Sequence, residues 1–357
     1  MLFRSQIEGR KLSKVVAIGD LFIGAMHYKN ALNGTAITFA ETNLPGTKED
    51  QHTAQQVMEF QGPNAVEPDA KVLADVKDAE IITAHFAPMG KKLIDAIPNL
   101  KLIAVARAGL ENVDVAEATK RGIGVVPAFG RNANAVAELQ IGLMLSEARN
   151  ISRADASIKQ GGWRKDFPGA RIEIGNSTIG MVGFGHVGRA MATKLKGFNP
   201  KILAFDPYAK AEDLANFNVT KVETIEEVFS KSDFVMCQAR LSAETERFIN
   251  KRLFDLMKPT AYFINVSRSR LVNQQDLIDA LKSGKISGAG IDVFDKEPLE
   301  LDDEFRKLDN ITMTTHFGGD TEGTNSYSGK LCADAIKSFI ETGKVSWAVN
   351  AKDLGWV

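Results

Sequence analysis

The sequence predicts an α/β protein with two domains, each built on a mainly parallel sheet. Short apolar runs alternate with helix-like segments along almost the whole chain, which is the pattern of strands joined by crossover helices. The length of 357 residues is enough for two domains. A strand followed by three glycines in the spacing G-x-G-x-x-G begins at Thr178, and this arrangement is typical of a doubly wound sheet.

In the first third of the chain, five apolar runs predict five strands, at residues 15–18, 36–39, 81–84, 102–105 and 124–126. Helices are expected between them, for example over 55–60 and 113–121. A single long helix is predicted over about 134–159. Because its first half is apolar nearly all round, we expect it to be buried or to lie at a domain or subunit junction.

The second block predicts seven strands, which begin near Thr178, Lys201, Val219, Phe234, Ala261, Gly288 and Ile311. The helices expected between them cover 187–196, 224–230, 251–257 and 274–282, and Thr224 with Glu227 forms a capping-box pattern at the start of the second. A last helix over about 321–341 shows apolar residues at helical spacing. It is too short to be a domain, so we expect it to return to the first domain.

Composition excludes several classes of protein. Apolar residues make up 44% and charged residues 25%, and the net charge of −1 gives no field that would attract nucleic acid or an anionic membrane. Cys237 and Cys332 are too few for a disulfide framework and lack metal-ligand spacing, so we expect buried free thiols and no metal site. Residues 1–14 lack a signal-peptide core, and no run reaches the ~20 apolar residues of a membrane helix. The cytoplasm is the expected location.

The glycine triplet and a following acidic residue predict a dinucleotide site. Gly183 permits the tight turn, Gly185 lets the backbone approach a pyrophosphate, and Gly188 lets the helix pack against the sheet. The open helix N-terminus attracts the phosphates. Asp206 ends the next strand and is expected to bind the ribose hydroxyls. A 2′-phosphate beside it would meet a repulsion of up to ~4 kcal/mol, so we predict NAD rather than NADP.

Three charged or titratable residues follow late strands of the same block, at the edge where such sheets bind ligands. Arg268 follows the strand that begins at Ala261, Glu297 follows the strand from Gly288, and His316 closes the strand from Ile311. Each alone is unremarkable, since a strand-end Arg or a loop Glu is usually a surface residue and a lone His is usually structural. Together, beside a nicotinamide, they suit a 2-hydroxy acid.

Five segments carry a family resemblance over nearly the whole chain and in the right order: residues 107–114, 183–188, 265–268, 290–298 and 316–319. They resemble the D-isomer-specific 2-hydroxyacid dehydrogenases. The resemblance implies a Rossmann-type NAD-binding domain over 134–316 and a flavodoxin-like substrate domain over 1–133 and 317–357, with the active cleft between them. It also implies a homodimer to which the long helix contributes.

The resemblance assigns roles to individual residues. Arg268, Glu297 and His316 match catalytic residues, and Asp292 matches the group that holds the nicotinamide carboxamide. The clamp for the substrate carboxylate is matched by Arg268 and by the backbone N–H groups of a loop in the first domain. This loop contains Ala108, Gly109 and Leu110. Further cofactor contacts are expected at His186, Val187, Ala239, Val266 and Gly318.

The chemistry of these groups agrees with those roles. His316, with an ordinary pKa of about 6.5, can take the hydroxyl proton as a hydride leaves carbon, and Glu297 would fix its tautomer and favour its protonated form. The planar guanidinium of Arg268 would pair with the planar carboxylate and polarise the carbonyl.

The chain departs from the family pattern in three places: Ser269-Arg270 after the arginine, Thr315 before the histidine, and Gln238-Ala239-Arg240 in place of His-Leu-Pro. These departures bear on substrate identity and on the loop near the cofactor. Arg240 is interpreted either as a contact to an anion or as a surface ion pair. Trp163 is expected to pack at the end of the long helix. His85 either lines the substrate pocket or is a partly exposed loop residue.

Several functions remain open at this stage. Phosphite dehydrogenases of this fold keep all three catalytic residues, whereas formate enzymes have Gln at the place of Glu297. Phosphoglycerate and hydroxypyruvate are both candidate substrates. A different class is an NAD-binding corepressor with binding rather than turnover as its function.

Overall fold

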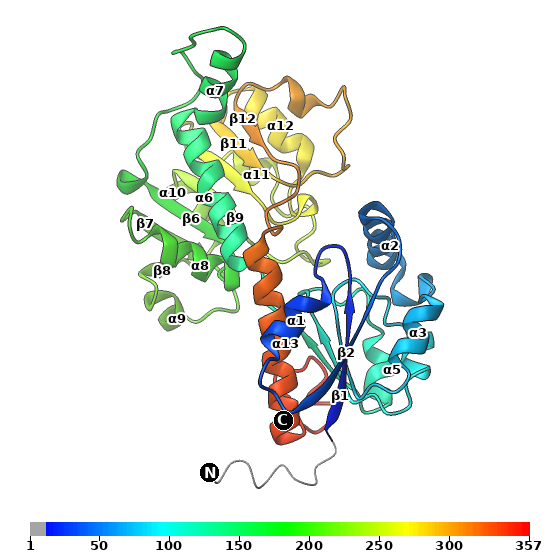
Figure 1. Cartoon of the computed structure of the whole chain (residues 1–357). Helices are drawn as coiled ribbons and strands as arrows, with labels where there is room; N and C mark the ends of the chain where they lie inside the picture. Colours follow the sequence, from blue (N-terminus) through cyan, green and yellow to red (C-terminus); the bar gives the residue numbers. More distant parts are fainter. Residues whose placement is uncertain (1–11) are drawn as a thin grey trace. The chain divides into compact units, whose positions relative to one another are not determined.

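The computed structural model describes residues 12–357, and the chain divides into two compact units (Figure 1). Unit 1 contains the chain up to Arg131 together with Thr321–Val357, and unit 2 is Asn132–Asp320. Most of the N-terminal segment considered for a signal peptide, residues 1–11, lies outside the described part. Within that part, no helix combines the length and the apolar character that crossing a membrane requires.

Unit 1 is built on a five-stranded parallel sheet in the order β2-β1-β3-β4-β5. This is the flavodoxin-like order, and the five predicted strands are confirmed. The strands are β1 (Ser13–Gly19), β2 (Ile37–Asn43), β3 (Ile81–Ala84), β4 (Leu102–Val105) and β5 (Gly124–Pro127). The helices are α1 (Ala25–Ala31), α2 (Lys48–Gln61), α3 (Ala70–Val76), α4 (Lys91–Asp95), α5 (Val115–Lys120) and α13 (Glu322–Thr342), with the 3₁₀ turn η1 (Pro63–Ala65).

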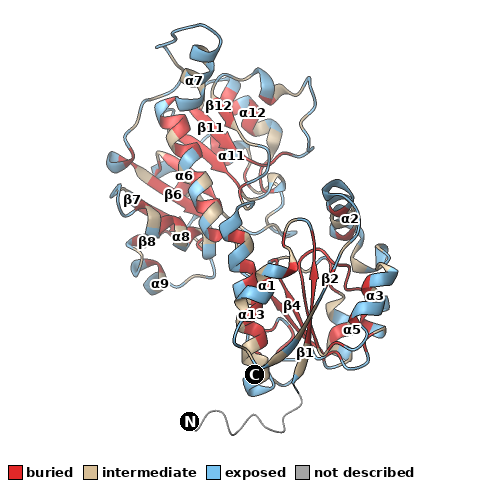
Figure 2. Cartoon of the chain, viewed as in Figure 1, coloured by how far each residue is buried: buried red, intermediate tan, exposed pale blue. Residues whose placement is uncertain are grey.

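Helices cover both faces of this sheet, and Figure 2 shows its inner strands as the buried layer, whereas the edge strand β2 is mostly intermediate or exposed. Alternate side chains of β1, such as Val15 and Val16, belong to two separate apolar clusters. One cluster includes residues of α3, α4 and α5, and the other includes residues of α1 and α13, among them Ile336. The last long helix therefore returns to the first unit, as its apolar spacing predicted.

Unit 2 is built on a seven-stranded parallel sheet in the order β12-β11-β10-β9-β6-β7-β8. All seven predicted strands are confirmed, and the order is that of a doubly wound sheet. The strands are β6 (Thr178–Val182), β7 (Lys201–Phe205), β8 (Val219–Lys221), β9 (Phe234–Cys237), β10 (Tyr262–Asn265), β11 (Gly288–Ile291) and β12 (Ile311–Met313). The helices are α6 (Ala133–Arg149), α7 (Ile151–Lys159), α8 (His186–Leu195), α9 (Ala211–Ala215), α10 (Ile225–Lys231), α11 (Lys251–Phe254) and α12 (Gln274–Lys282), with 3₁₀ turns η2 (Ile174–Asn176), η3 (Ser269–Leu271) and η4 (Glu304–Lys307).

The predicted single helix over 134–159 is wrong in one respect, because it is broken at Asn150. That residue adopts a left-handed conformation with φ of 55°, which asparagine tolerates better than most side chains, and it separates α6 from α7. Arg153 holds the corner by donating to Glu147 at 2.9 Å and to Asn150 Oδ1 at 3.1 Å. Trp163 was expected to pack at the end of this helix, but it is 75% exposed.

Candidate active site

Three adjacent parallel strands of unit 2 bring the predicted catalytic residues to one edge of the sheet. β10, β11 and β12 are neighbours, and their carboxyl ends lead into the loops that carry Arg268, Glu297 and His316 respectively. All three residues are exposed at the surface of the unit. The topology therefore explains why residues widely separated in the sequence share one edge.

His316 and Glu297 form a direct pair, with 2.7 Å between Nδ1 and Oε2. The second oxygen of Glu297 accepts a hydrogen bond from the backbone N–H of Phe294 at 2.9 Å. The hydrogen bond with Glu297 raises the pKa of His316 against the opposing effect of burial. Burial alone would raise the pKa of Glu297, but its bonds with His316 and Phe294 hold it below the ordinary value. Because Glu297 occupies Nδ1, Nε2 is the ring nitrogen available for a ligand.

The loop that carries His316 is strained and is held by Asp292. His316 has φ of 56°, a left-handed conformation that few non-glycine residues adopt. Asp292, only 1% exposed, accepts from Thr314 Oγ1 at 2.5 Å, Phe317 N at 3.2 Å and Gly318 N at 3.0 Å. A carboxylate thus binds both sides of the histidine loop. Both Asp292 and Thr314 are visible in the sequence, but the role of Asp292 in holding the histidine loop was not predicted. The contact of Asp292 with the nicotinamide stays a prediction.

The Arg268 loop is held in a similar way by Asn265, the last residue of β10. The Asn265 amide donates to Arg268 O at 3.1 Å and its oxygen accepts from Ser267 N at 3.0 Å. Arg268 itself donates from Nη1 to Ser267 O at 2.8 Å. Its positive charge acts on the pKa values of both Glu297 and His316. Asn265 lies in one of the five segments that carry the family resemblance, but the role of its buried amide in positioning the arginine loop was not predicted.

The three glycines after β6 differ in what surrounds them. Gly183 has φ of 96°, and a Cβ there would lie 3.0 Å from the backbone of Gln238. A Cβ on Gly188 would lie 2.9 Å from Gln238 Oε1 and 3.0 Å from Phe184 Cδ2. By contrast, a Cβ on Gly185 would meet no atom of the part of the chain that the structure describes within 4 Å. The protein's own packing requires two of the glycines, whereas the third borders open space in front of α8.

That open space suits a dinucleotide phosphate. α8 begins at His186, and no side chain of the described residues caps its N-terminus. Its first N–H groups and its positive dipole end are therefore available to an anion. Asp206 follows β7 and accepts from the backbone N–H groups of Phe184, Tyr208 and Ala209 at 2.8, 2.9 and 3.1 Å. The carboxylate thus ties the glycine loop to the end of the next strand.

Gln238, Ala239 and Arg270, which depart from the family pattern, make local contacts. Gln238 donates to Gln140 Oε1 on α6 at 2.9 Å and lies over Gly188, while Ala239 follows it beside Gly183. Arg270 pairs with Glu246 at 2.6 Å. Val266 and Gly318, two further predicted cofactor contacts, lie together, since a Cβ on Gly318 would be 2.7 Å from Val266 Cγ1. None of these residues displaces the three side chains of the site.

In unit 1, the loop after β4 carries Ala108, Gly109 and Leu110. None of their three backbone N–H groups donates a hydrogen bond within residues 12–357, so they are available to an anion. The Glu111 carboxylate lies against Gly109 and pairs with Arg107 at 3.3 Å. Of the two interpretations of His85, the partly exposed loop residue is wrong, because His85 is only 3% exposed, and the pocket-lining role stays a prediction. Cys237 and Cys332 are free and buried, as predicted.

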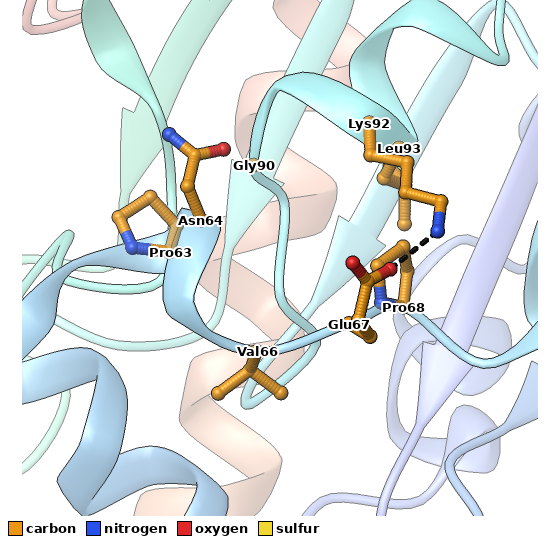
Figure 3. Close-up of a pocket in the computed structure, with 8 residues that line it drawn as sticks. All are labelled: Pro63, Asn64, Val66, Glu67, Pro68, Gly90, Lys92 and Leu93. Atoms are coloured by element: carbon orange, nitrogen blue, oxygen red, sulfur yellow. Dashed lines mark hydrogen bonds and ion pairs between the residues drawn. The ribbon is translucent and has the colours of Figure 1, made fainter.

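A hollow of about 30 Å³ lies between η1 and α4 (Figure 3), with Lys92 paired to Glu67 at its rim. That volume holds about one water molecule, so the hollow carries no substrate. Within the described part of the chain, no group of three His, Cys, Asp or Glu side chains is arranged to hold a metal ion.

Residues 141–318 match the family profile described as D-isomer specific 2-hydroxyacid dehydrogenase, NAD binding domain. The chain is 35% identical over 281 residues to a glyoxylate reductase of Pyrococcus furiosus, which covers 76% of this chain and 82% of the relative. The chain belongs to the D-isomer-specific 2-hydroxyacid dehydrogenase family. Its membership confirms the resemblance carried by the five sequence segments.

Other members of this dehydrogenase family show the range of the likeness. A D-3-phosphoglycerate dehydrogenase of Methanocaldococcus jannaschii is 35% identical over 286 residues; the match covers 80% of this chain but only 54% of that protein. A solved NADPH-dependent glyoxylate/hydroxypyruvate reductase of Sinorhizobium meliloti aligns with a TM-score of 0.69 at 24% identity, over 93% of this chain and 96% of that one. The structural likeness supports the two-unit fold.

Proposed function

We propose that this family member interconverts a D-2-hydroxy acid and its 2-keto acid by hydride transfer to or from a nicotinamide dinucleotide. The observation that carries the proposal is the 2.7 Å pair of His316 and Glu297, which lies at the same sheet edge as Arg268 and the glycine loop. An acid–base group, a carboxylate that controls its proton and a guanidinium are the groups that this reaction needs.

The proposed roles follow from the hydrogen bonds. With Nδ1 bound to Glu297, His316 uses Nε2 to donate a proton to the carbonyl oxygen in reduction, and to accept the hydroxyl proton in oxidation. Arg268 pairs with the substrate carboxylate, and the free N–H groups of Ala108, Gly109 and Leu110 provide a second clamp. The dinucleotide, when bound, supplies or accepts the hydride.

The residues present fit that dinucleotide, because the open space at Gly185 and the uncapped start of α8 suit its pyrophosphate. His186, Val187, Ala239, Val266, Asp292 and Gly318 are proposed as further contacts. We propose a preference for NAD, since the anionic Asp206 at the end of β7 disfavours a 2′-phosphate. Comparing KM values for NADH and NADPH tests the preference, and a lower value for NADPH would refute it.

The assignment of functions to domains is also a proposal. Residues 134–316 would bind the nucleotide, and residues 1–133 with 317–357 would hold the substrate. A homodimer is proposed because α7 has no buried residue and exposes Ile151 and Ile158, which leaves these two apolar side chains uncovered by residues 12–357. A cytoplasmic location stays a prediction.

The deciding experiment is turnover of 2-keto acids with NADH by the wild-type protein. His316→Asn should lower kcat by at least ~100-fold, whereas His52→Asn, a change of the same kind at an exposed position on α2, should leave kcat unchanged. Near-normal turnover by His316→Asn would contradict the assignment. Turnover of phosphite in place of every keto acid would favour the phosphite alternative, and dinucleotide binding without any turnover would favour a regulatory protein.

A further inference from the structure

Helix α2 of unit 1 lies at the edge of the sheet where the strands of that unit end. Gln51 accepts from the backbone N–H of Leu21, in the loop after β1, at 2.9 Å and donates to the carbonyl of Leu44, directly after β2, at 3.1 Å. Glu59 pairs with Arg107, in the loop after β4, at 3.1 Å. Because all strands of this sheet are parallel, these loops share its carboxyl edge, the usual ligand-binding edge. The helix therefore lies over the ligand edge of its own unit.

Polar groups, rather than apolar packing, attach α2 to unit 1. Within residues 12–357, helices α1, α3, α4, α5 and α13 all contribute side chains to one of the two apolar clusters of unit 1, whereas α2 contributes none. The buried residues of α2 are Gln51 and Met58, and Figure 2 shows most of the helix as exposed. Few buried apolar contacts are typical of elements that open at a low cost in free energy.

Glycines with positive φ flank α2 on both sides. Gly46, two residues before the helix begins, has φ of 89°, and Gly62, directly after it, has φ of 83°. A Cβ on Gly62 would meet no atom of residues 12–357 within 4 Å, so the backbone angle rather than the packing requires glycine there. A few residues of this kind at the ends of an element can absorb the backbone changes by which a lid moves.

The ion pair of Glu59 and Arg107 joins the C-terminal end of α2 to the loop after β4. The Arg107 side chain is only 10% exposed, against 39% for Glu59, and its guanidinium lies 5.5 Å from the centre of the Phe86 ring. Arg107 directly precedes residues 108–110, whose backbone N–H groups are proposed to bind the substrate carboxylate. The pair thus links the position of α2 to the loop that is proposed to hold the substrate.

We propose that α2 is a lid on unit 1 and that Glu59 is its latch. The helix opens about Gly46 and Gly62 to admit and release the substrate, and it closes when Glu59 pairs with Arg107. Glu59 is a positioning residue, because it acts on the substrate through Arg107 and the loop that follows. One partly exposed ion pair and a few hydrogen bonds hold the closed state, so the lid can open in each turnover. This inference rests on the proposed dehydrogenase function and adds to it a moving part within unit 1.

Hydrogen–deuterium exchange of the full-length protein, followed by mass spectrometry, tests whether α2 opens. In the wild-type protein, the amides of residues 48–61 should exchange at least ~10-fold faster than those of α13, which belongs to an apolar cluster. Glu59→Ala should accelerate exchange in α2 further and leave α13 unchanged. The control is Glu80→Ala, which removes an ion pair of 2.7 Å with Lys101 at the opposite edge of the same sheet, and it should not change exchange in α2.

Steady-state kinetics test whether the opening matters for turnover. Loss of the latch lowers the fraction of the protein that is closed, and the apparent affinity for the substrate falls by that fraction. In Glu59→Ala the KM for the best 2-keto acid should rise about 5-fold, while kcat does not fall and the KM for NADH stays unchanged. Glu59→Gln, which keeps an acceptor for Arg107 without the charge, should recover part of the change. Glu80→Ala should leave both KM values unchanged.

The outcomes separate this inference from the function on which it rests. If α2 of the wild-type protein exchanges as slowly as α13, the helix is fixed and the lid is overturned, while the dehydrogenase proposal stands. An unchanged KM for the keto acid in Glu59→Ala overturns the lid even where α2 exchanges fast. A fall in kcat, or an equal rise in both KM values, shows a general defect and also overturns it. If the wild-type protein reduces no keto acid, the dehydrogenase proposal fails and the lid fails with it.

Discussion

Replacing each loop glycine by alanine separates cofactor binding from protein stability. In Gly185→Ala the new methyl group meets no atom of residues 12–357 within 4 Å, and the negative φ of −83° lies outside the left-handed region that favours glycine. Alanine is a poorer N-cap than glycine by up to ~1 kcal/mol. It also restricts the unfolded chain, which stabilises the folded state by about 0.4–1 kcal/mol. We therefore expect the free energy of unfolding to change by less than ~0.5 kcal/mol.

The other two substitutions should be destabilising for different reasons. Gly183→Ala places a side chain at φ of 96° and within 3.0 Å of the Gln238 backbone, which should cost about 1–3 kcal/mol in backbone strain alone. Gly188→Ala forces a methyl group to 2.9 Å from Gln238 and 3.0 Å from Phe184, and overpacking of this kind costs about 1–3 kcal/mol. For a domain of this size, each kcal/mol lowers the Tm by about 2–4 °C.

The effect on NADH binding should be largest in Gly185→Ala, the variant whose stability changes least. The methyl group of Gly185→Ala occupies the space proposed for the pyrophosphate, so the Kd for NADH should rise at least ~10-fold, about 1.4 kcal/mol. Thermal unfolding and NADH fluorescence titration of the three variants measure both quantities. Two results would refute the reasoning: an unchanged Kd in Gly185→Ala, or a loss of Tm in that variant as large as in Gly183→Ala.

Three further predictions concern charged groups. Keto acid reduction needs protonated His316, so its rate should fall as pH rises through the raised pKa of that residue. Glu297→Gln should move this fall to lower pH. An unchanged pH–rate profile would show that Glu297 does not control the proton. Arg268→Lys loses the planar donor pair and should lower kcat/KM about 10–100-fold, mostly through KM for the keto acid, while KM for NADH serves as the control. Asp20→Ala should lower the free energy of unfolding by about 3–5 kcal/mol, because the buried backbone N–H groups of Ile23 and Phe86 lose their acceptor. Urea denaturation measures this free energy. A decrease of less than about 1 kcal/mol would show that these hydrogen bonds do not stabilise the fold as expected.

The sequence predicted most of the fold because both sheets are parallel and buried. Strands such as β3 and β4 are buried at every residue, so they are read as continuous apolar runs bounded by loops. The same topology predicted the candidate site, since parallel strands deliver the residues after β10, β11 and β12 to one edge. A motif and a sheet order together therefore indicate which distant residues share a surface.

What the sequence did not predict depends on individual backbone angles and on burial. The break at Asn150 needs one left-handed residue inside an otherwise helical pattern, and the apolar periodicity of 134–159 continues through it without a signal. His85 follows a buried strand, and the sequence alone does not show whether the loop that it begins is exposed or packed. The ring is buried because Phe22 and Phe86 pack around it. Its hydrogen-bond partner, the carboxylate of Asp20, is 65 residues away in the sequence.

Asp292 shows how one carboxylate links the fold of unit 2 to its chemistry. A left-handed histidine costs about 1–3 kcal/mol, and bonds from Asp292 to Thr314, Phe317 and Gly318 offset that cost on both sides of the residue. The same negative charge also raises the pKa of His316. The ring of His316 is bonded to Glu297, and the negative charges of Glu297 and Asp292 both favour the protonated imidazole. Positioning and protonation of His316 thus have a common origin in the residue that follows β11, which is why a change at Asp292 would alter both together.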